Sequence, residues 1–141
     1  MEPTILVVED NPTLQKMVSL MAKRRGVETV VVGTCAEAEA AVSTDPDRFA
    51  LILMDWSLPD NTGLYCTQMV RTHLTHKVPI VAMTGHAMPG DREACFAAGM
   101  DDYLCKPFTF AEFTSLLNKW MQVQPLPLRP PDQPDIKELG A

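Results

Sequence analysis

Short apolar runs alternate with longer segments of helical periodicity along about the first 120 residues. Five runs rich in branched apolar residues predict β-strands at residues 4–9, 28–32, 51–54, 80–83 and 103–105. The first and third runs, TILVVE and LILM, show no polar alternation. That pattern is typical of strands that are buried on both faces of a parallel sheet.

The segments that follow the apolar runs carry helix signals. They predict helices over about residues 12–25, 34–44, 64–73, 91–98 and 109–120. The pairs Thr34–Glu37 and Thr109–Glu112 have the T-x-x-E spacing of a capping box, which marks two of the helix starts.

This alternation predicts an α/β fold, a doubly wound five-stranded parallel sheet with helices on both faces. Right-handed crossovers leave few topologies, and the flavodoxin-like order 2-1-3-4-5 is the commonest for five strands. We therefore expect one domain over residues 1–123. Residues 124–141 hold five prolines and no apolar period, which predicts a Pro-rich tail that is disordered or a linker.

Composition narrows the function classes. The 141 residues carry a net charge of −6, which disfavours a nucleic-acid surface and contact with an anionic membrane. No apolar run approaches the roughly 20 residues that span a bilayer, and the first residues do not resemble a secretory signal.

The chain has four cysteines, Cys35, Cys66, Cys95 and Cys105, and no two form a C-x-x-C pair. We interpret them as buried, reduced side chains rather than as zinc ligands or disulfides. A reducing compartment, and hence a cytoplasmic location, is the expectation.

Chemistry-bearing side chains follow four of the five predicted strands. Glu9 and Asp10 follow the first strand, Asp55 the third, Thr84 the fourth and Lys106 the fifth. Because ligands of open parallel sheets bind outside the carboxyl ends of the strands, we expect these five residues to converge.

Three crowded carboxylates repel one another and need compensating cations. Lys106 supplies one positive charge, and Mg²⁺ suits the remainder because it accepts a few protein oxygens together with phosphate oxygens. Asp55 ends a central strand and is the best-placed nucleophile for forming an acyl phosphate. The Thr84 hydroxyl could then donate to a phosphoryl oxygen.

With these residues in place, the chain resembles a response-regulator receiver domain of two-component signalling over about residues 4–121. The resemblance is carried by residues 5–11 (ILVVEDN), 53–59 (LMDWSLP), 81–85 (VAMTG) and 99–108 (GMDDYLCKPF). The separations of 45 residues from Asp10 to Asp55, 29 from Asp55 to Thr84 and 22 from Thr84 to Lys106 also fit the family.

The resemblance implies a metal site and a phosphoacceptor. Asp55 would be both the phosphoacceptor and a ligand of Mg²⁺, together with Glu9, Asp10 and the backbone carbonyl of Ser57. Glu9 stands where Asp is more frequent in the family. Its longer side chain favours contact with the metal through water.

The resemblance also implies a switch beside the metal site. Thr84 would be the switch hydroxyl, Tyr103 the switch aromatic, and Lys106 the partner of the phosphate. The bond between Lys106 and Pro107 would be a cis peptide, which only about 5–6% of X-Pro bonds are in folded proteins.

The function that the resemblance implies is a phosphoacceptor switch, not an enzyme acting on small substrates. It would take a phosphoryl group from the phosphohistidine of a histidine kinase or phosphotransfer protein. It would then change a protein-interaction surface or relay the phosphate. Residues 88–93 and 99–103 are similar to receivers of hybrid histidine kinases, and a homodimer would use the fourth helix, fifth strand and fifth helix.

Two other function classes fit the same residues less well. An aspartyl phosphatase would want a second acid two residues after its nucleophile, where this chain has Ser57. A flavodoxin-like cofactor carrier would want phosphate-binding amides where residues 9–12 instead present two acids and a proline. A receiver used only as a constitutive docking surface stays open. No output domain pattern follows residue 123, so we expect the output to be a partner protein, a domain outside this sequence, or onward phosphotransfer.

Overall fold

The structure is a computed structural model that describes residues 3–85 and 90–121. Its elements alternate as predicted: β1 (Thr4–Val8), α1 (Pro12–Arg24), β2 (Glu28–Val32), α2 (Cys35–Thr44), β3 (Phe49–Asp55), α3 (Gly63–His73), β4 (Ile80–Thr84), α4 (Asp91–Ala97), β5 (Asp102–Cys105) and α5 (Phe110–Trp120). Strand ends differ from the predicted ends by no more than two residues. The predicted boundary near residue 123 and the tail over 124–141 lie outside the described residues and stay predictions.

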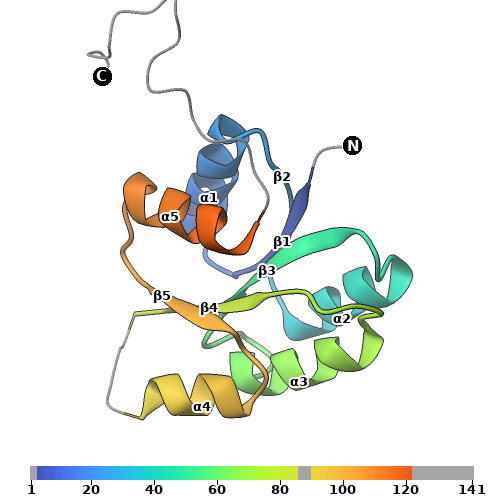
Figure 1. Ribbon diagram of the computed structural model, residues 1–141. Helices are drawn as coiled ribbons and strands as arrows, with labels where there is room; N and C mark the ends of the chain where they lie inside the picture. The colour runs from blue at the N-terminus through green and yellow to red at the C-terminus, as the bar shows by residue number, and fades with distance from the viewer. Residues whose placement is uncertain (1–2, 86–89, 122–141) are drawn as a thin grey trace, which may run out of the picture.

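The five strands form one parallel sheet in the order β2-β1-β3-β4-β5, which confirms the predicted flavodoxin-like topology. Figure 1 shows α1 and α5 on one face of this sheet and α2, α3 and α4 on the other. β3 lies between β1 and β4 in the middle of the sheet. Its last residue, Asp55, therefore lies at the centre of the edge formed by the carboxyl ends of the strands.

An apolar cluster fills each side of the sheet. Leu6 and Val8 of β1 belong to the cluster under α2, α3 and α4, whereas Ile5 and Val7 belong to the cluster under α1 and α5. All four side chains are fully buried. This period of two explains why β1 reads as a continuous apolar run, because a strand covered on both faces exposes neither set of side chains.

Both T-x-x-E pairs lie at helix starts, but only one of them forms the full reciprocal pattern. Thr109 and Glu112 form the predicted capping box at the start of α5. At α2 the Thr34 hydroxyl accepts from the Glu37 N–H, but the Glu37 carboxylate accepts from the N–H of Gly33 instead. The second capping box is therefore half formed, and Glu37 ties the loop after β2 to its helix.

Three of the cysteines are buried and reduced, as predicted. Burial raises the pKa of the Cys66 and Cys95 thiols, which keeps them protonated at neutral pH. The prediction was wrong for Cys105, which is exposed because it is the last residue of the edge strand β5. Among the described helices, none is both long enough and apolar enough to cross a bilayer.

Candidate functional site

A cleft of about 600 Å³ opens at the carboxyl edge of the sheet. It brings together six of the residues that the sequence singles out: Glu9, Asp10, Asp55, Ser57, Thr84 and Lys106. They come from the ends of β1, β3, β4 and β5, as the strand-end argument predicts. The sheet topology therefore assembles the site from segments that lie far apart in the sequence.

The two inner carboxylates are held by the strands that deliver them. Glu9 follows β1 and is only 1% exposed, and its N–H donates to the Val32 carbonyl at 2.9 Å. Asp55 is the last residue of β3 and is 6% exposed. The next residue, Trp56, donates its N–H to the Met83 carbonyl at 2.9 Å, which extends the pairing of β3 with β4 beyond the acid.

Lys106 joins these two carboxylates. Its Nζ lies 2.8 Å from Glu9 Oε1 and 3.0 Å from Asp55 Oδ1. Its backbone N–H donates to the Thr84 carbonyl at 2.7 Å, so the strand-end pairing also fixes where the side chain starts. Burial alone would lower the pKa of Lys106, but the hydrogen bonds to Glu9 and Asp55 outweigh it and raise that pKa. The ammonium is therefore charged at neutral pH.

Glu9 is the most buried of the three acids. Burial raises the pKa of its carboxyl group, against the opposing effect of the hydrogen bonds from Lys106 and the Asn11 N–H. Both carboxylate oxygens are engaged, Oε1 by Lys106 and Oε2 by Asn11 N–H at 3.0 Å. Bonds of this kind orient a carboxylate beside a metal site, and they suit an acid that reaches a cation through water.

The third acid, Asp10, is exposed at the mouth of the cleft and completes a cluster with Glu9 and Asp55. One oxygen of each acid lies within 4.8 Å of the others. Three carboxylates and the single ammonium of Lys106 leave two net negative charges, which match the charge of a divalent cation. Oxygen donors at this spacing fit Mg²⁺, which prefers carboxylates and keeps several waters.

Gly63, which sequence reasoning passed over, shapes the backbone that carries Asp55. It starts α3, and its N–H donates to the Trp56 carbonyl at 2.7 Å. A Cβ at this position would stand 2.2 Å from the Asp55 carbonyl oxygen, so only glycine fits the backbone as it is. A glycine at a helix start is a weak signal in a sequence, because the helix itself does not require it there.

Ser57 and Tyr103 differ in their distance from the cleft. Ser57 lines it, and its N–H points to Asp55 Oδ1 at a long 3.5 Å. Tyr103 is half-buried in β5, packs against the cluster under α2, α3 and α4, and is absent from the described cleft lining. The guanidinium of Arg92 lies 5.8 Å from the centre of its ring. The bond between Lys106 and Pro107 is cis, the isomer that the family resemblance implies.

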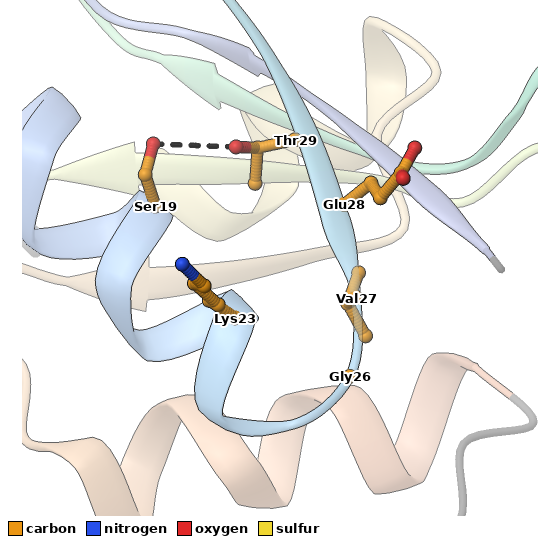
Figure 2. A pocket seen from close by; sticks show the side chains of 6 residues that line it. All are labelled: Ser19, Lys23, Gly26, Val27, Glu28 and Thr29. Carbon is orange, nitrogen blue, oxygen red and sulfur yellow. Dashed lines mark hydrogen bonds between the residues drawn. The ribbon is translucent and has the colours of Figure 1, made fainter.

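A second hollow, of about 480 Å³, lies between the end of α1 and the start of β2 (Figure 2). Thr29 donates its hydroxyl to the Ser19 hydroxyl at 3.2 Å, Lys23 points toward this pair, and Glu28 points away. Because β2 begins here, this hollow is at the opposite end of the strands from the acidic cleft. Among the described residues that line this hollow, Glu28 is the one acid.

Comparisons with known proteins agree with this geometry. Residues 5–118 match the family described as the response regulator receiver domain. The receiver domain of the sensor histidine kinase PA1611 from Pseudomonas aeruginosa is 37% identical, with a TM-score of 0.76, covering 85% of this chain and 98% of that one. That structure holds a magnesium ion coordinated in its active site cleft.

Curated relatives include much longer sensor kinases. The sensor histidine kinase GacS of Pseudomonas protegens is 32% identical over 122 residues, which is 84% of this chain and 13% of that protein. The histidine-protein kinase BarA of Escherichia coli is 34% identical over 122 residues, 83% of this chain and 13% of that protein. The chain thus spans about an eighth of these relatives. On its match over residues 5–118, the fold and the acidic cleft, this chain belongs to the response regulator receiver domain family.

Proposed function

We propose that this chain is a phosphorylatable receiver in which Asp55 takes a phosphoryl group from a phosphohistidine. The observation that carries the proposal is the meeting of three carboxylates with the ammonium of Lys106 in one cleft. A cluster with this charge is costly unless it binds a cation, and it can then accept an anionic group.

Asp55 is proposed as the acceptor because of its place among the three acids. Glu9 is buried and has both oxygens engaged, and Asp10 is exposed at the mouth. Asp55 Oδ1 is held by Lys106, whereas Oδ2 has no hydrogen bond from the described residues. One oxygen is thus oriented and the other is available to attack phosphorus.

The transfer is a displacement at phosphorus. An oxygen of Asp55 forms a bond to phosphorus while the bond from phosphorus to the donor's imidazole nitrogen breaks. The donor ring carries a proton on its other nitrogen, so the electron pair stays on the departing nitrogen and the ring leaves as neutral imidazole. Lys106 stabilises the negative charge on the phosphoryl oxygens, and the hydroxyl of Thr84, which lines the cleft, donates to one of them.

Magnesium would be held by Asp10, Asp55 and the Ser57 carbonyl, with Glu9 reached through water. When bound, the ion supplies electrostatic neutralisation of the phosphoryl group. Support comes from the fit of the acidic cluster and from the magnesium in the related PA1611 receiver. The chain's own residues orient the three carboxylates, because each acid lies at the end of a strand or just before a helix.

The partners follow from the chemistry. A phosphohistidine donor implies a histidine kinase or a phosphotransfer protein, and similarity to GacS and BarA favours a receiver that works within or beside a sensor kinase. Use of the phosphorylated form as a switch, with Thr84 and Tyr103 as its moving parts, belongs to the same proposal. A homodimer through α4, β5 and α5 stays a prediction.

The test is intact-mass analysis after incubation with a small phosphodonor such as acetyl phosphate, with Mg²⁺ and with EDTA. The native chain should gain one phosphoryl group only with Mg²⁺, and Asp55→Asn should gain none. Asp47→Asn is the matched control, because Asp47 is 77% exposed and precedes β3 at the far end from Asp55. An equal adduct on Asp55→Asn would assign the acceptor elsewhere.

A further inference from the structure

The first turn of α2 is capped by a residue from a distant loop. The carboxylate of Asp60 accepts the Cys35 N–H at 2.8 Å and the Ala36 N–H at 3.0 Å. The side chain of the local cap, Thr34, accepts the N–H of Glu37 and no other N–H of the described helix start. Two of the four donors that every helix start leaves open are thus satisfied from 24 and 25 residues away in the sequence.

Asp60 belongs to the loop that leaves Asp55. This acceptor loop, residues 56–62, folds back on itself, since Ser57 and Thr62 form an antiparallel bridge and the Leu58 N–H donates to the Asn61 carbonyl at 3.0 Å. The loop's base is tied to β4 through Trp56. Its tip is tied to α2 through Asp60.

The chemistry of this tie suits a permanent anchor. The N–H groups of Cys35 and Ala36 hold the pKa of Asp60 below its usual range, so the carboxylate is ionised at neutral pH. A carboxylate at a helix start also faces the positive end of the helix dipole. The tie between Asp60 and α2 is therefore in place at neutral pH.

We propose that Asp60 is a positioning residue for the acceptor site, holding the acceptor loop against α2 so that Ser57 and Asp55 keep the geometry that metal binding needs. This inference rests on the proposed function. Ser57 is three residues from Asp60 and shares the folded-back loop with it. When the tip is released, the loop keeps its internal bridge between Ser57 and Thr62 and its anchors at Trp56 and at the buried side chain of Leu58, but it loses its tie to α2.

The test separates capping a helix from positioning a loop. Asp60→Ala removes both, whereas Thr34→Ala removes a cap from the same helix without touching the acceptor loop. Mg²⁺ affinity would be measured from the fluorescence of Trp56, which lines the cleft, and the phosphorylation rate from acetyl phosphate at saturating Mg²⁺. Thermal unfolding would be followed in parallel.

We expect both variants to unfold at lower temperature, but only Asp60→Ala to bind Mg²⁺ on the order of 10-fold more weakly, as residues that orient metal ligands do. Asp60→Asn should lie between, because its amide oxygen still accepts from one N–H. Native affinity and rate in Asp60→Ala, or equal losses in Thr34→Ala, would overturn the proposal. If the native chain itself neither binds Mg²⁺ nor is phosphorylated, the proposed function fails, and the inference fails with it.

Discussion

Gly63 lies so close to Asp55 that a Cβ on the glycine would stand 2.2 Å from the aspartate's carbonyl oxygen. Relief would need a backbone shift at the strand end or at the start of α3. We expect Gly63→Ala to destabilise the protein by about 1–3 kcal/mol, the range for forced overpacking, and to weaken Mg²⁺ binding.

Urea unfolding and Mg²⁺ titration would measure both effects of this change. Gly33→Ala is the matched control, because a Cβ there meets its nearest neighbours at 3.7–3.9 Å, which is ordinary contact. Equal stability of the two variants would show that the backbone near Asp55 can move at little cost, which would contradict the expected clash at Gly63.

We expect the charge of Asp10 to destabilise the metal-free protein although it contributes to Mg²⁺ binding. It adds a negative charge beside Glu9 and Asp55, and among the described residues Lys106 is the one cation that pairs with this cluster. Asp10→Asn is expected to raise the unfolding free energy of the metal-free protein by about 0.5–1 kcal/mol, the size of a partly screened repulsion. The same variant should lose most of the stabilisation that added Mg²⁺ gives the native chain.

Thermal unfolding in EDTA and in excess Mg²⁺ tests this pair of effects. Glu28→Gln removes an exposed acid far from the cleft and should change neither value. A metal-free Asp10→Asn protein less stable than the native one would mean that the acid makes a favourable contact instead.

The lowered pKa of Asp102 predicts how the stability of the fold changes in acid. Burial alone would raise the pKa of this carboxyl, but hydrogen bonds from Trp120, Lys119 and the Tyr103 N–H outweigh it and lower that pKa from 3.8. A lowered folded-state pKa stabilises the fold above pH 3.8, and this contribution is lost as the pH falls through the lowered value.

Melting temperatures of native protein and Asp102→Asn between pH 7 and pH 2 would show this. The native advantage should be constant near neutrality and shrink below about pH 4. If the stability advantage of the native protein over Asp102→Asn grew as the pH fell, the pKa of Asp102 would be raised rather than lowered by folding.

Arg71 joins α3 to the two segments that lead into β4 and β5. Its guanidinium donates to the carbonyls of Gly99 and Val78 and pairs with Asp101 at 2.8 Å. Lysine cannot donate from several nitrogens in this geometry. Arg71→Lys should therefore lower the free energy of unfolding, measured with urea, by about 2 kcal/mol. Arg48→Lys, on an exposed residue, should be nearly neutral, and a neutral Arg71→Lys would contradict the role given to these hydrogen bonds.

The order of the strands and the membership of the cleft could be predicted because both follow from periodicity. Apolar runs mark buried strands, and parallel strands bring the residues that follow them, such as Asp55 and Lys106, to one edge. What the sequence did not reveal are contacts between loops and distant helix starts. Asp60 reaches Cys35 from 25 positions away, and Gly63 matters only because the Asp55 carbonyl happens to approach it.

Surface exposure at the sheet edges was also beyond prediction. Cys105 ends an edge strand, where one side chain can face solvent although its neighbours are apolar. The hydrogen-bond partner of the Glu37 carboxylate was predicted wrongly for a related reason. T-x-x-E spacing allows this carboxylate to accept from the N–H of Gly33 as well as from that of Thr34, and the conformation of the loop decides which N–H it reaches.

The central place of β3 has a consequence for how the molecule opens. Its backbone pairs on both sides, with β1 and β4, whereas β2 and β5 each pair on one side within the described chain. Amide hydrogens of the margins should therefore exchange with solvent sooner than those of β3, since local fluctuations begin where fewest neighbours must be released. Transient fraying can loosen either border of the sheet while the aspartate at the end of its innermost strand stays in register.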